Sequence, residues 1–132
     1  MTAITQEIIQ DKIFNVRGKQ VMLDRDLAVL YGVETKVLNQ AVKRNLERFP
    51  GDFMFQLSKD ELKSIRSQFV TLDRKGAHSK YLPAVFTEQG IAMLASVLRS
   101  ETAILMSIEV MRAFVAMRRY WKMRYLFYLG AL

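Results

Sequence analysis

The side chains best suited to recognition chemistry lie in segment 35–46, TKVLNQAVKRNL. Lysine and arginine can neutralise phosphates or donate to guanine, and asparagine and glutamine can pair with adenine in the major groove. At about 100° per residue on a helical wheel, one half holds Lys36, Asn39, Gln40, Lys43, Arg44 and Glu47, and the other holds Val37, Leu38, Ala41, Val42 and Leu46. An ordinary surface helix shows the same division, so the wheel alone leaves both interpretations open.

The preceding residues predict the element that would position this helix. Asp24 is expected to cap a helix that runs to about Tyr31, and Gly32 is expected to end it in a left-handed conformation. Ala28 is small enough to let two helices cross. Two short amphipathic helices joined by a glycine turn predict a helix-turn-helix over residues 24–46. Asn45 is predicted to cap the end of the second helix.

Residues for other chemistries are scarce. The chain has no cysteine and one histidine, His78, so a structural zinc site and a disulfide framework are excluded. Asp24 and Asp26 are explained by helix capping and a favourable charge at a helix N-terminus, without a metal. His78 has no evident nucleophile or orienting acid beside it. The sequence therefore predicts no catalytic residue, metal site, cofactor or enzyme activity.

The overall charge points to a polyanionic partner. Twenty Lys plus Arg against thirteen Asp plus Glu give a formal net charge of +7, which favours nucleic acid first and an acidic membrane second. Residues 102–117 are the most apolar run, but Glu109 and Arg112 interrupt it, so no membrane span is predicted. The N-terminus has no secretory pattern. Charge alone does not choose between these partners, but together with the predicted helix-turn-helix it favours double-stranded DNA. We expect a cytoplasmic protein.

The other elements follow from turn and cap signals. Ser58 and Glu61 form a capping box, and Thr87 and Ser100 are placed to begin helices. Pro83 restricts its strand to a sheet edge or a strand end. The predicted order is a hairpin at 13–23 turning at Gly18, the helix pair, a strand at 53–57, a helix from 58 to about 69, a strand at 81–86, a helix from 87 to about 98, and a last helix from 100 nearly to the C-terminus.

Three sequence blocks resemble a known family. They read RGKQVMLDRDLAVLYGVETKVLNQAVKRNLERFPGDFMFQL, YLPAVFTEQGIAMLASVLRSETA and MRAFVAMR. Together they resemble the phage ORF-six N-terminal domain, which is grouped with the KilA-N and Bro-N DNA-binding modules of phages and large DNA viruses. The resemblance runs from about Ile13 to Arg118, and the residues after about Lys122 do not match it.

The resemblance implies a non-catalytic α+β DNA-binding module of antirepressor-like or transcription-regulating phage proteins. We expect a helix-turn-helix of winged-helix-like type, a small antiparallel sheet and a long C-terminal helix. Its DNA-binding residues are predicted from the wheel rather than from the family. Lys36, Asn39, Gln40 and Lys43 are predicted to point toward the groove, and Arg44 and Arg48 toward the backbone. Thr35 is also included among the predicted contacts.

The segment LDRKGAHSK, residues 72–80, has two interpretations. It could be a basic wing that lays Arg74, Lys75 and Lys80 along phosphates, or a solvated loop. We include the three residues among the predicted DNA contacts.

The last helix is predicted to be an appendage. We divide the chain into a DNA-binding domain at 8–99 and a C-terminal helix at 100–132. Ile104, Ile108, Met111 and Val115 recur every three or four residues, and further apolar residues widen this surface. A helix that is apolar on more than one side needs a second partner, so we expect a homodimer contact here. The alternatives are a core helix with an exposed end, and a contact that captures another regulatory protein.

Overall fold

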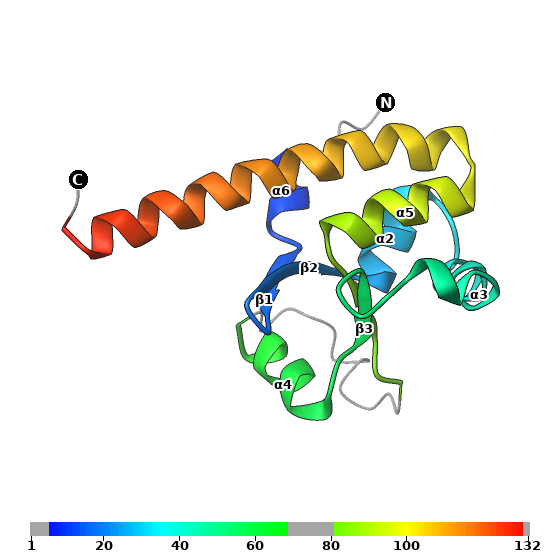
Figure 1. Cartoon of the computed structure of the whole chain (residues 1–132), viewed down its shortest axis with the longest axis horizontal. Helices are drawn as coiled ribbons and strands as arrows, with labels where there is room; N and C mark the ends of the chain where they lie inside the picture. Colours follow the sequence, from blue (N-terminus) through cyan, green and yellow to red (C-terminus); the bar gives the residue numbers. More distant parts are fainter. Residues whose placement is uncertain (1–5, 69–80, 131–132) are drawn as a thin grey trace.

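The computed structural model describes residues 6–68 and 81–130 and contains an antiparallel sheet with helices on both faces (Figure 1). In chain order the elements are α1 (Gln6–Gln10), β1 (Ile13–Val16), β2 (Lys19–Leu23), α2 (Asp24–Tyr31), α3 (Thr35–Arg44), the 3-10 helix η1 (Leu46–Arg48), β3 (Met54–Gln56), α4 (Lys59–Gln68), β4 (Ala84–Phe86), α5 (Glu88–Leu98) and α6 (Glu101–Tyr128). The predicted α+β class, the small antiparallel sheet and the long C-terminal helix are confirmed.

The sheet has four strands in the order β1-β2-β4-β3, each antiparallel to its neighbours. The predicted hairpin turns at Arg17 and Gly18, whose φ values are 54° and 73°. Two consecutive left-handed residues match the twist of a two-residue hairpin. Pro83 immediately precedes β4, which is an inner strand. Its predicted place at a strand end is therefore confirmed.

Alternation along the strands divides the core in two, because successive side chains point to opposite faces of a sheet. Met22 and Phe86 join a core with α1, α2, α3, α5 and α6. Val21, Leu23 and Val85 join a second core with α4 on the other face. The sheet is thus covered on both sides, and the helix pair 24–44 lies in the larger layer.

The N-terminus of α4 is joined to the hairpin turn. Ser58 and Glu61 form the predicted capping box, with hydrogen bonds of 2.8 and 3.1 Å. The Glu61 carboxylate also accepts from Arg17 at 2.7 and 2.9 Å. The hydrogen bond from Arg17, more than any other contact, lowers the pKa of Glu61 to about 2. The turn and the helix therefore fix each other.

The first half of α6 belongs to the main core. Ala103, Val110, Ala113 and Phe114 are buried in the same cluster as α2 and α5, and Ser107 is hydrogen-bonded to Tyr31 of α2 at 2.9 Å. Burial raises the pKa of Tyr31 to about 12. The second half of α6 extends beyond the sheet, away from the other helices (Figure 1). The predicted division of the chain at residue 100 stays a prediction, but this packing joins the start of α6 to the preceding helices.

The winged-helix-like detail of the predicted fold is not confirmed. The hairpin β1–β2 precedes the helix pair in the chain, whereas the wing is predicted at residues 72–80. That segment, with Arg74, Lys75 and Lys80, lies outside the described residues. Its role stays a prediction.

Gly90 allows α5 to approach the chain before β3 closely. A Cβ atom added at Gly90 would lie 1.9 Å from the carbonyl oxygen of Phe53, so the backbone would have to move. Overpacking of this kind costs about 1–3 kcal/mol. We therefore expect Gly90→Ala to lower the free energy of unfolding by about that amount, as measured by urea denaturation.

The control for this substitution is Gly51→Ala. A Cβ atom added at Gly51 would meet nothing within 4 Å, and the residue has no positive φ. Equal stability of the two variants would contradict the close packing of α5 at Gly90.

Candidate nucleic-acid interface

The two helices α2 and α3 form a helix-turn-helix at one end of the molecule (Figure 1). Gly32 has a φ of 69° and ends α2 in the predicted left-handed conformation. The backbone N–H of Val33 donates to the carbonyl of Ala28 at 3.0 Å. Ala28 itself is 1% exposed, as expected for a small residue at a helix crossing. The helix-turn-helix prediction is confirmed as geometry.

The exposed face of α3 carries four of the predicted DNA-binding side chains. They are Lys36, Gln40, Lys43 and Arg44. Thr35 is half-buried at the start of the helix, and Arg48 is exposed in η1, which follows α3. Asn45 donates to the carbonyl of Ala41 at 2.9 Å, which confirms its capping role. The face therefore presents three cations and one amide from a single helix.

The buried face of α3 differs from the wheel. Leu38 and Val42 are buried, but Val37 is 43% exposed and Leu46 is 57% exposed. The prediction that all five apolar residues share the buried half was therefore wrong for these two. Helix α3 ends at Arg44 and Leu46 lies in the following 3-10 helix, so the α-helical wheel does not apply to Leu46. Val37 lies at the border, where periodicity cannot separate buried from exposed positions.

The side chain of Asn39 is hydrogen-bonded to other parts of the protein. Its Nδ2 atom donates to a carboxylate oxygen of Asp24 at 3.0 Å and to the hydroxyl of Tyr81 at 2.7 Å. The side chain is partly buried. A role of Asn39 in reading bases stays a prediction, but its donor atom is already used by two partners. The geometry instead makes Asn39 a brace between α3 and the rest of the fold.

Asp24 is the centre of this network. It is 1% exposed, and its two oxygens accept hydrogen bonds from several segments of the chain. Besides Asn39, the donors are the hydroxyl of Tyr81, the backbone N–H of Ala84 at 3.3 Å and the backbone N–H of Arg25 at 2.7 Å. A buried carboxylate needs such partners because desolvation disfavours its charge. The side chain thereby joins α2, α3 and the start of β4.

The predicted capping role of Asp24 needs a correction. The N-cap of α2 is Leu23, which makes no side-chain cap bond, and Asp24 is the first helical residue. Its charge still lies at the positive end of the helix, as expected. The side chain, however, mainly serves contacts to distant segments, which the local cap signal could not show.

Tyr81 is a member of the site that sequence reasoning missed. Its hydroxyl donates to Asp24 and accepts from Asn39, while its side chain remains 42% exposed beside α3. Burial of the hydroxyl, followed by the bond to Asp24, raises the pKa of Tyr81. No sequence signal connects it with Asp24, 57 positions earlier. The sequence shows only that Tyr81 directly follows the basic segment 72–80, which does not indicate a contact with Asp24.

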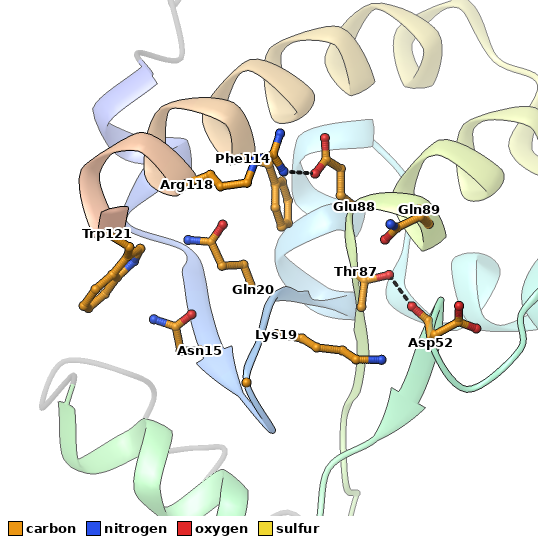
Figure 2. A pocket seen from close by; sticks show the side chains of 11 residues that line it. Asn15, Lys19, Gln20, Asp52, Thr87, Glu88, Gln89, Phe114, Arg118 and Trp121 are labelled. Carbon is orange, nitrogen blue, oxygen red and sulfur yellow. Dashed lines mark hydrogen bonds and ion pairs between the residues drawn. The ribbon is translucent and has the colours of Figure 1, made fainter. Parts of the chain in front are cut away.

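A separate pocket of about 490 Å³ lies between the β1–β2 hairpin, the start of α5 and α6 (Figure 2). Arg118 and Glu88 form an ion pair across it, and Thr87 donates to the carbonyl of Asp52 at 2.7 Å. The Nε2 atom of Gln20 is buried without a hydrogen-bond partner among the described residues. The lining residues are Asn15, Gly18, Lys19, Gln20, Asp52, Thr87, Glu88, Gln89, Phe114, Arg118 and Trp121. None of them belongs to α3.

The described part of the chain offers neither a metal-ligand cluster nor a membrane-spanning helix. Within residues 6–68 and 81–130, no three His, Cys, Asp or Glu side chains are grouped so that they could hold a metal ion. Over the same ranges, no helix has both the length and the apolar content needed to cross a bilayer.

The architecture is that of a small α+β module with a helix-turn-helix exposed at one end. The family model of the ORF6N domain matches residues 11–97, about two thirds of the chain. The chain therefore belongs to the ORF6N family of phage-type regulatory domains. Neither the comparison with curated proteins nor the comparison with solved structures gives a match.

The Asp24 network gives a direct test of how α3 is held. Asp24→Asn removes the negative charge and replaces one accepting oxygen with an NH₂ group, which would face hydrogen-bond donors such as Asn39 and Tyr81. Hydrogen bonds to charged groups contribute about 1.5–3 kcal/mol, so we expect a loss of that size in the free energy of unfolding, measured with urea. Asp11 is exposed, and Asp11→Asn is the control with the same chemical change. If both variants unfold like the parent chain, Asp24 does not hold the helix.

Proposed function

We propose that the chain is a non-catalytic DNA-binding domain that places α3 in the major groove of double-stranded DNA. The observation that carries the proposal is the exposed face of α3, with Lys36, Gln40, Lys43 and Arg44 side by side on the second helix of a helix-turn-helix. In this motif the second helix enters the groove and its N-terminal residues contact base edges. The ORF6N assignment supports a regulatory role of this kind.

The contacts divide by chemistry. We assign Lys36 and Gln40, near the start of α3, to base edges, and Lys43, Arg44 and Arg48 to phosphates. Val37 is exposed beside them and is suited to apolar contact with a thymine methyl group. This assignment differs from the one predicted from the sequence: it adds Val37, moves Lys43 from the groove to the phosphates, leaves out Thr35 and makes Asn39 a positioning residue.

The biological outcome we propose is regulation of transcription or antirepression in a phage setting. The alternative function is capture of another regulatory protein through α6, and the exposed aromatic residues at its end favour it. Tyr125 and Tyr128 are 65% and 85% exposed. A pull-down that resists nuclease and survives charge reversal at Lys36 and Lys43 would support capture. A nuclease-sensitive interaction lost on charge reversal would support DNA binding.

Salt dependence tests the electrostatic part of the proposal. If Lys43, Arg44 and Arg48 each neutralise one phosphate, log K should fall with log salt at a slope of about −2.7 per subunit. Lys43→Ala should weaken binding to all sequences alike and bring the slope closer to zero by about 0.9. The slope is measured by fluorescence anisotropy on one labelled duplex. Arg124→Ala, in the second half of α6, is the control of equal charge. A slope changed equally by both variants would place the phosphate contacts elsewhere.

Sequence preference tests the base contacts. A duplex site is first selected from a random pool, and its affinity is compared with that of a duplex changed at one base pair. Gln40→Ala should reduce the discrimination by about 1–3 kcal/mol, because one bidentate contact is lost.

Asn39→Ala is the informative comparison. We expect it to weaken binding to both duplexes equally and to destabilise the fold, since its partners lie within the protein. If Asn39→Ala instead abolishes discrimination without loss of stability, Asn39 reads a base and our assignment is wrong.

A further inference from the structure

Helix α6 has two apolar faces, and only one of them is covered by the described residues. The inner face packs in the main core through Ala103, Val110 and Phe114. A second face, about 120° around the helix from the first, exposes Ile104 at 52%, Ile108 at 46% and Val115 at 37%. No described element covers this second face, although it runs over about three turns of the helix.

The exposed face has a definite order of charge. One stripe along the helix consists of residues spaced three, four or seven positions apart, and we call it the outer stripe. Its residues are Glu101, Ile104, Ile108, Val115, Arg119 and Lys122. It begins with an acid, continues with apolar residues and ends with two bases. Among the described residues, neither Glu101 nor Arg119 nor Lys122 forms an ion pair, whereas Arg112 and Arg118 beside them do.

We propose that the outer stripe binds the outer stripe of a second copy of this chain in an antiparallel, twofold-symmetric pair. Antiparallel pairing centred between residues 111 and 112 puts Ile108 opposite Val115 of the other copy and Glu101 opposite Lys122 of the other copy. A parallel pair would put acid against acid and base against base, which is unfavourable. The opposed helix dipoles also favour the antiparallel arrangement.

The outer stripe is complementary to itself, and this favours a second copy of the chain as its binding partner. A nucleic acid would suit Arg119 and Lys122 but not the isoleucines or Glu101. In a second copy the twofold axis brings Glu101 to Lys122 and Ile108 to Val115, while Ile104 lies opposite Arg119, whose aliphatic stem can cover it. Helix α3 lies on the side of the molecule where α6 begins (Figure 1). The pair would therefore carry its two α3 helices at opposite ends. This inference does not depend on DNA binding.

Sedimentation equilibrium of the full chain, without DNA, tests association. We expect the apparent mass to rise with concentration from 15.3 kDa toward twice that value. Ile108→Lys should stay monomeric with an unchanged circular dichroism spectrum, because Ile108 contacts solvent in the single chain. A parent chain that stays at 15.3 kDa at every concentration would overturn the proposal.

A charge exchange tests the orientation. Glu101→Lys and Lys122→Glu should each raise the dissociation constant by about tenfold, since every change acts twice in a symmetric interface. The two changes together in one chain should restore association. Glu47→Lys, an equal charge change in η1, should have no effect. Failure of the double variant to recover would reject the antiparallel pairing of these ends.

Cysteine cross-linking tests the register, and the chain has no cysteine of its own. In the antiparallel pair, residue 108 of each copy lies seven residues, about 10.5 Å, from residue 108 of the other along the axis. A disulfide spans Cα atoms about 4.4–6.8 Å apart. Ile108→Cys and Val115→Cys should therefore cross-link when mixed but not alone. A disulfide formed by each variant alone would indicate a parallel pair and contradict the proposal.

Discussion

The arrangement of the helix-turn-helix depends on one buried carboxylate. Asp24 accepts hydrogen bonds from Asn39 in α3, from Tyr81 and from the backbone at the start of β4, while it belongs to α2 itself. Apolar packing of Leu38 and Val42 holds α3 against the core, but the hydrophobic effect itself has no direction. The hydrogen bonds to the buried Asp24 carboxylate do have a direction and limit how α3 can turn. The orientation of the exposed face of α3 is therefore set by a polar contact behind it.

The local parts of the structure could be predicted from the sequence. The hairpin turn at Gly18, the end of α2 at Gly32, the capping box at Ser58 and the caps at Thr87 and Ser100 all depend on residues within four positions of one another. Such signals depend only on neighbouring residues, so they do not require knowledge of the rest of the fold. The family resemblance was also confirmed, over residues 11–97.

The tertiary parts could not be predicted in this way. Asp24 signals a helix start, and nothing local shows that its carboxylate turns toward Asn39, 15 positions later, or toward Tyr81, 57 positions later. A helical wheel also cannot assign burial at the border between its two halves. Asn39 and Val37 lie at such borders, and Asn39 is partly buried while Val37 is exposed, the reverse of what the wheel predicts. The candidate site was thus found as a segment, while its bracing residues became visible only in three dimensions.

Two separate surfaces carry the proposed DNA binding and the proposed association. At one end the sheet and α5 support a helix-turn-helix with a cationic outer face, and at the other the second half of α6 extends from the core (Figure 1). Burial of the inner face of α6 stabilises the domain, and we propose that its outer stripe, which begins in the half that packs on the core, provides the contact between copies. DNA binding and association can therefore be changed separately by substitutions.

The most direct test of the central claim is a map of backbone amide shifts by nuclear magnetic resonance. The full chain is titrated with a duplex selected from a random pool, at low salt. We expect the largest shifts on residues 35–48, with Lys36, Gln40 and Lys43 prominent, and little change in α4. Shifts confined to α6, or no shifts at all, would contradict the claim that α3 contacts DNA.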